Sequence, residues 1–210
     1  MNQKFVSKSN FVLRKVLNTE NSLDIIKDFI ESILNIKIIS IRLNPYLQEM
    51  AKCLPTEENF GIADVRVITD SNQELNIGIQ FIDGIFIQNK MFLYYAQIHA
   101  NQLKHRDNRK IAKTITINIL DYKYFEGTAY HKKVLIKDRK KTIEGEIEIH
   151  VLELPKFRIE NVNCLTDKEE WMLYFKEKNS KKIQSVINGA LYIKKLDILL
   201  DDFWKSEKME

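Results

Sequence analysis

Apolar and polar residues alternate most clearly between positions 61 and 80 of the chain. Alternation of this kind is typical of strands with one buried face. Asp64 occupies a polar position in the first run, and Gly78 and Gln80 occupy the corresponding positions in the second. The polar residues 70–73 between the two runs predict a turn. We therefore predict an antiparallel hairpin in which Asp64, Gly78 and Gln80 share one face.

Apolar positions at three-and-four spacing predict helices in other parts of the chain. These helices are expected at about 22–34, at about 86–104, around 171–175 and around 186–196. Asn21 or Ser22 is expected to cap the first of them. Strands are predicted at 36–43, 114–119 and 144–154, the last with one face exposed. Because a strand, a helix and a strand follow one another from the hairpin onward, we expect a crossover between parallel strands.

This order of elements predicts an α/β chain of the α+β type, with a mixed central β-sheet flanked by helices. No linker of distinct composition separates an independent domain. We expect residues 1–160 to form the core and residues 161–210 to form a C-terminal helical extension packed on that core.

Composition narrows the class of protein. A chain of 210 residues that is 44% hydrophobic is long enough for one domain with a substantial core. No apolar run approaches the roughly 18 residues that span a bilayer, and residues 1–9 lack a secretion signal, so a cytoplasmic protein without membrane contact is expected. Cys53 and Cys164 have no metal-ligand spacing and are expected to be reduced. The net charge of +4 is compatible with a polyanionic partner.

The hairpin residues suggest a chemistry. Hydrolysis of a phosphodiester needs an activated water and relief of phosphate charge, and a magnesium ion held by carboxylates supplies both. Asp64 is a candidate ligand, the main-chain carbonyl of Ile79 is a second, and Gln80 is a candidate for orienting the water. Gly78 offers no side chain where a second carboxylate would be expected.

The same residues carry a family resemblance. Asp64, a turn and the sequence Ile-Gly-Ile-Gln at 77–80 resemble the Asp and Ile-Glu-x-Gln core of the recombination-promoting nuclease and transposase family, within the PD-(D/E)XK nuclease superfamily. Segment 10–18 is similar to the family's Asp-x-x-Phe-Lys-x-x-Phe-Gly motif, and segment 92–103 resembles the helix after its active hairpin. The resemblance covers nearly the whole chain. It implies a restriction-endonuclease-like core and Mg²⁺- or Mn²⁺-dependent DNA cleavage in recombination or transposition.

The departures from the family pattern bear on activity. Gly78 stands at the position of the metal-binding glutamate, and Asn10 stands where an aspartate is usual. Glu74 is four residues before Gly78, roughly 13 Å away along a strand, and is too distant to substitute. Asp83 follows the strand, and a bend at Gly84 would bring it nearer.

Two hypotheses follow. The chain is a weakened Mg²⁺-dependent DNA endonuclease, or it is a catalytically inert relative without a cofactor that binds nucleic acid or protein and regulates active family members. DNA is the expected partner, with a second copy or an active family member as further partners. Candidate DNA-binding residues lie after the hairpin and in the basic stretch that follows: Lys90, Arg106, Arg109 and Lys110. Tyr94 and Tyr95 are expected to be core aromatics of the second helix.

Overall fold

A computed structural model provides the fold of the chain. It describes residues 10–44, 61–82, 87–104, 112–135, 148–159, 164–177 and 181–207. The strands of these ranges are β1 (Ile38–Leu43), β2 (Ala63–Thr69), β3 (Glu74–Ile82), β4 (Lys113–Leu120), β5 (His131–Leu135) and β6 (Glu148–Glu153). The α-helices are α2 (Asn10–Leu17), α3 (Leu23–Leu34), α5 (Ile87–Lys104), α6 (Asp167–Lys176), α7 (Lys181–Gly189) and α8 (Leu191–Ser206), and two short 3₁₀ helices are η1 (Glu20–Ser22) and η3 (Leu154–Lys156).

The strands form one six-stranded sheet in the order β1-β2-β3-β4-β6-β5. β1, β2 and β3 pair antiparallel, β3, β4 and β6 pair parallel, and β5 pairs antiparallel with β6 at the edge. The sheet is therefore mixed, and α5 is the crossover between the parallel strands β3 and β4. The predicted α+β fold with C-terminal helices is confirmed, and it is consistent with a restriction-endonuclease-like fold.

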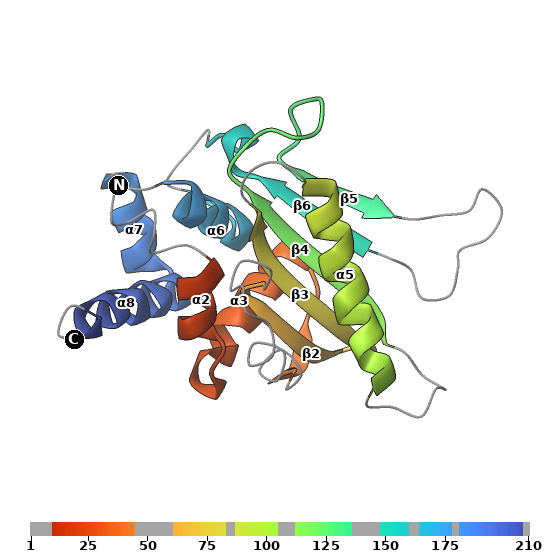
Figure 1. The fold of residues 1–210 in the computed structure, drawn as a ribbon. Coiled ribbons are helices and arrows are strands. Elements are labelled where there is room, and N and C mark those ends of the chain that lie inside the picture. The colour runs from red at the N-terminus through yellow and green to blue at the C-terminus, as the bar shows by residue number, and fades with distance from the viewer. Residues whose placement is uncertain are drawn as a thin grey trace.

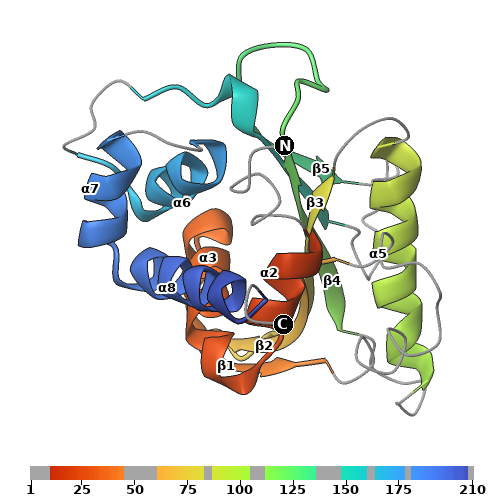
Figure 2. The ribbon, with the colours of Figure 1, turned by 60° about the vertical axis from the view of Figure 1, so that its left-hand side comes forward.

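Helices lie on both faces of the sheet. α5 covers one face, and α2, α3, α6, α7 and α8 gather on the other (Figures 1 and 2). The second face is the larger core, because apolar residues of the strands, of α3 and of the C-terminal helices belong to one buried cluster. Trp171 of α6 is buried in it, and its indole Nε1 donates a hydrogen bond to Asp28 of α3 at 2.8 Å.

The predicted hairpin and helices are present, and the structure differs from the prediction at the following elements. The cluster of apolar positions around 186–196 forms two helices, α7 and α8, that are separated at Ala190. Ser22 does precede α3 but does not cap it, because its hydroxyl donates to the carbonyl of Val16 at 2.9 Å. β6, predicted to have one exposed face, is buried along its whole length. β5, which the sequence pattern did not predict, covers its outer edge.

Membrane-spanning helices were sought within the described ranges, and none of the helices there has the length and apolar character to traverse a bilayer.

Candidate functional site

The strand register brings the predicted hairpin residues together. Asp64 of β2 lies directly opposite Gly78 of β3, and Gln80 lies two residues further along β3. Gln80 in turn lies opposite Asn118 of β4. Because side chains alternate between the faces of a strand, Asp64, Gly78 and Gln80 share a face, as predicted. This is the face that α5 covers (Figure 2).

Asp64 is enclosed by protein. Its side chain is 0% exposed, and neither carboxyl oxygen has a hydrogen-bond partner of good geometry among the described residues. Burial raises the pKa of Asp64 to about 8, and the nearby Asn44 side chain and Arg66 charge lower it by less. Asp64 is therefore largely protonated at neutral pH. A neutral carboxyl group is a poor ligand for a hard divalent cation.

Two residues of α5 fill the space beside Gly78. A Cβ atom at position 78 would lie 2.1 Å from Cδ1 of Ile98 and 3.0 Å from the Tyr94 ring. A Cβ atom at Gly61 would lie 2.0 Å from the Tyr94 hydroxyl oxygen. Gly61 and Gly78 thus form a cradle in which the absence of side chains lets the Tyr94 ring approach the sheet. The space that a glutamate at position 78 would need is occupied by Tyr94 and Ile98.

The Ile79 carbonyl, predicted to be a metal ligand, is already in use. It accepts a hydrogen bond from the Tyr94 hydroxyl at 3.2 Å and another from the backbone N–H of Ile62 at 2.6 Å. The Tyr94 hydroxyl is also 3.1 Å from the Ala63 carbonyl. The hydroxyl has one proton for the two carbonyls, so the Ile79 oxygen is engaged by the Ile62 N–H and shares the Tyr94 proton with Ala63.

Gln80 belongs to a polar row across the sheet. Its Nε2 donates to Oδ1 of Asn118 at 2.6 Å, and Nδ2 of Asn118 donates to the His150 carbonyl at 3.0 Å and to Thr116 Oγ1 at 3.2 Å. The Gln80 residue is only 7% exposed. Its amide is therefore held by a neighbouring strand rather than directed at a solvent-filled space.

The comparisons with known proteins give the family. The family model described as PD-(D/E)XK nuclease family transposase matches residues 7–209 of the chain. The chain belongs to the PD-(D/E)XK nuclease family of transposases. Neither the curated proteins nor the solved structures contain a match to it. The family resemblance inferred from the hairpin is thereby confirmed over almost the full length.

The residues of this PD-(D/E)XK chain do not fit the divalent metal that the nuclease fold implies. The pKa of Asp64 is raised to about 8, Gly78 has no ligand atom on its side chain, and the Ile79 carbonyl already accepts hydrogen bonds. Within the described ranges, no group of three or more His, Cys, Asp or Glu side chains could hold a metal ion. Asp83, the alternative ligand, lies outside the described residues.

The predicted DNA-binding residues of the PD-(D/E)XK chain stay predictions. Lys90 lies on α5, but its side chain is outside the described part of the structure, as are Arg106, Arg109 and Lys110. The sequence pattern did not indicate a role for Arg14 of α2. Burial raises the pKa of the Tyr94 hydroxyl, and the charge of Arg14 lowers it by less. The place of Arg14 within the motif-like segment 10–18 was an available signal.

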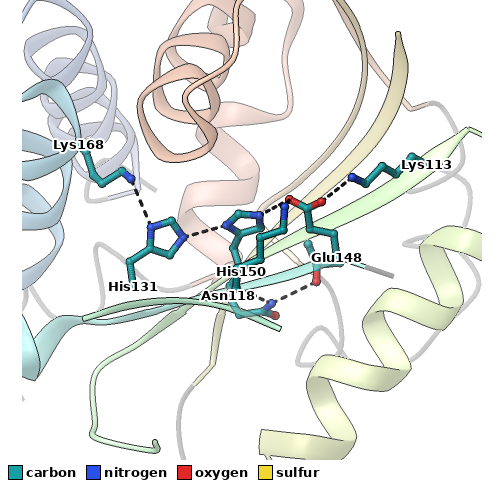
Figure 3. A network of polar contacts seen from close by, with 8 residues as sticks. Lys113, Asn118, His131, Glu148, His150 and Lys168 are labelled. Atoms are coloured by element: carbon teal, nitrogen blue, oxygen red, sulfur yellow. Dashed lines mark hydrogen bonds and ion pairs between the residues drawn. The ribbon is translucent and has the colours of Figure 1, made fainter. Parts of the chain in front are cut away.

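A second buried polar cluster lies on the opposite face of the sheet (Figure 3). Lys168 Nζ donates to His131 at 3.3 Å, His131 is hydrogen-bonded to His150 at 2.8 Å, and His150 to Glu148 at 2.7 Å. Lys113 and Lys133 form ion pairs with Glu148 at 2.5 and 2.7 Å. The alternation of residues 148–151 places Glu148 and His150 on one face, but nothing in it indicated that α6 and β5 would enclose that face.

Proposed function

We propose that this chain is a non-cleaving member of the PD-(D/E)XK nuclease family of transposases, which acts by binding DNA. The observation that carries the proposal is the position of Tyr94. Its ring stands where the second metal-binding carboxylate would be, and its hydroxyl occupies the Ile79 carbonyl.

The chemistry of hydrolysis explains why this arrangement favours binding over cleavage. Metal-assisted attack on a phosphodiester needs a cation with open coordination positions next to the substrate. Tyr94 and Ile98 belong to a buried surface of α5 that also includes Met91 and Tyr95. Admission of a cation and a phosphate to Asp64 would therefore require displacement of packed side chains, together with deprotonation of the Asp64 carboxyl group.

Family membership and charge support DNA as the partner. Nucleic-acid affinity without sequence readout comes chiefly from lysine and arginine contacts to phosphates, and the chain has 33 basic against 29 acidic residues. We therefore expect binding with weak sequence preference and strong salt dependence.

A second candidate function is regulation of an active family member by direct contact. The observation in its favour is an exposed apolar pair on the outer side of α5, where Phe92 is 53% exposed and Leu93 is 66% exposed. Exposed apolar groups of this size are common at protein interfaces. This candidate predicts inhibition of an active relative that is lost in Phe92→Ser with Leu93→Ser.

The test combines a cleavage assay with a binding assay. Wild type and Asp64→Asn are incubated with supercoiled plasmid in Mg²⁺ or Mn²⁺, and both are titrated into a labelled DNA duplex at low and high salt. We expect no nicking by either protein and the same salt-dependent binding by both. Nicking by the wild type that disappears in Asp64→Asn would overturn the proposal, because a contaminating nuclease would survive the substitution.

A further inference from the structure

A basic hollow lies at the end of the sheet, between the 121–130 connection that follows β4 and the short helix η3 that follows β6. The cavity has a volume of about 370 Å³ and is lined by Lys123, Gly127, Thr128, Tyr130, Pro155, Lys156 and Arg158. In Figures 1 and 2 the connection and η3 lie together at the top of the molecule. Both follow the carboxyl ends of parallel strands, the edge at which open sheets commonly bind ligands.

A buried carboxylate fixes the walls of this hollow. Glu153, which is 0% exposed, accepts hydrogen bonds from the backbone N–H groups of Tyr124 at 2.5 Å and Phe125 at 3.1 Å. Its other oxygen pairs with Lys156 Nζ at 2.8 Å, and Lys156 also donates to the Phe125 carbonyl. One acid therefore joins the connection to η3, and the hollow is built before any ligand arrives.

The remaining charges of the hollow are positive. Glu153 is matched by Lys156, whereas Lys123 and Arg158 are exposed and make no ion pair with another described residue. Lys176 lies close enough to Arg158 for their charges to repel, and Glu177 offsets part of the charge of Lys176. Glu169 acts on Tyr130 at the rim but does not line the hollow. Asp121 and Glu126, the acids of the connection, do not line it. Thr128 and Tyr130 add hydroxyl groups that suit an anionic oxygen.

We propose that this hollow binds a phosphate group of a nucleic-acid backbone, with Lys123 and Arg158 as the contacting cations. The proposal rests on the proposed DNA-binding function and names the surface that performs it. Lysine and arginine with a few hydroxyl groups are the usual partners of backbone phosphates. Both cations are exposed, so a phosphate held between them leaves its flanking nucleotides in solvent.

The test compares two double variants that each remove two positive charges. Lys123→Gln with Arg158→Gln changes the hollow, and Lys194→Gln with Lys205→Gln changes exposed lysines of α8.

Binding of a labelled duplex is measured by fluorescence anisotropy across a salt series. Binding of inorganic phosphate is followed through the backbone amide NMR signals of Gly127 and Thr128. The hollow variant is expected to bind DNA about tenfold more weakly, with a salt slope reduced by about 2, and to lose the phosphate-induced shifts. The α8 variant is expected to keep both.

Each other outcome overturns a definite part of the proposal. Equal weakening by the two double variants would show that only total charge matters and would refute the hollow. Loss of the phosphate shifts with unchanged DNA affinity would assign a site for free phosphate and refute the nucleic-acid ligand. A wild type that does not bind DNA would refute the proposed function itself, whereas the phosphate shifts would still report on the hollow.

Discussion

Asp64 and Glu148 are both buried carboxyl groups on strands of one sheet, yet their surroundings leave Asp64 mostly neutral and Glu148 ionised at neutral pH. Asp64 faces the Tyr94 ring on the α5 side, where burial raises its pKa to about 8. On the other face, hydrogen bonds from His150, Lys113 and Lys133 outweigh burial and hold the pKa of Glu148 well below its usual range. Burial alone therefore does not decide whether an acid is ionised. The number of hydrogen-bond donors and cations near the carboxyl group also determines its charge.

The surroundings of the two acids also differ in how completely their polar groups are hydrogen-bonded. The Glu148 cluster is a complete hydrogen-bond chain with one direction, because Lys168 can only donate to His131, which then donates to His150, which donates to Glu148. Burial and the charges of Lys168 and His150 lower the pKa of His131 to about 4, which keeps this ring neutral at physiological pH. We interpret this cluster as structural. Asp64, by contrast, has no hydrogen-bond partner of good geometry among the described residues, and the neutral Tyr94 side chain fills space beside Gly78, the residue directly opposite it.

The largest expected effect is a difference in stability between a variant of Glu148 and a variant of Asp64. Glu148→Gln leaves the charges of Lys113 and Lys133 without their partner and should lower the free energy of unfolding by about 3 kcal/mol, a value reduced for the partial exposure of the lysines. At pH 5, Asp64→Asn should cost less than about 1 kcal/mol, since it replaces one neutral group by another in the folded chain and removes an acid that ionises on unfolding. Urea denaturation of the three proteins measures both. Equal losses would contradict the comparison.

The pH dependence of stability should sharpen the contrast. The pKa of Asp64 is higher in the folded than in the unfolded chain, so the folded state binds the extra proton and stability falls as pH rises from about 3.8 to about 8. Asp64→Asn removes this loss, and the stability of the variant relative to wild type should rise by about 1.4 kcal/mol per pH unit inside that window. Denaturation at pH 5, 6 and 7 measures the trend, and a constant difference would refute it.

The Glu148 cluster should make stability depend on pH in the opposite direction. The lowered pKa values of Glu148 and His131 mean that protons favour the unfolded chain, so this contribution is present above the unfolded pKa values and is lost on acidification. For His131 the loss begins near pH 6.5 and is complete below about 4. His131→Gln should therefore flatten the acid limb of the stability profile, and a profile unchanged below pH 6 would contradict this assignment.

A glutamate at position 78 should not fit without a change in α5. Gly78→Glu is expected to cost about 2 kcal/mol because its side chain meets Ile98 and Tyr94. Ile98→Ala also destabilises by loss of packing, but the double variant should cost at least about 1 kcal/mol less than the sum of the two single variants. Denaturation of all four proteins tests this coupling. Strict additivity would mean that Ile98 does not fill the space beside position 78.

A smaller effect than that of Gly78→Glu is expected from loss of the Tyr94 hydroxyl group, which donates to the Ile79 carbonyl. Tyr94→Phe keeps the ring between Gly61 and Gly78 and removes one hydrogen bond, so it should cost about 1 kcal/mol. Tyr94→Leu, which also removes the ring, is the control and should cost clearly more. A Tyr94→Phe variant as unstable as Tyr94→Leu would show that the hydroxyl, rather than the ring, holds α5 on the sheet.

The sequence predicted the hairpin well, because alternation and a polar turn determine which side chains share a face. It placed Asp64, Gly78 and Gln80 on one face, as the strand register has them. The sequence could not predict that Tyr94 fills the space beside Gly78. Helical spacing indicates that Tyr94 is buried, but it does not indicate which atoms of the sheet its hydroxyl contacts. The Glu148 cluster was missed for a related reason. Its burial depends on pairing with β5, whose sequence His-Lys-Lys-Val-Leu reads as a basic surface segment.

The most direct test of the closed centre is an NMR titration of the Asp64 carboxyl carbon, recorded with and without millimolar Mg²⁺. We predict a midpoint near pH 8 that Mg²⁺ does not move, because the group is buried and no cluster of described His, Cys, Asp or Glu side chains would hold the ion beside it. A carboxyl group already ionised at pH 5, or a midpoint that Mg²⁺ lowers, would contradict the account and restore a working metal centre.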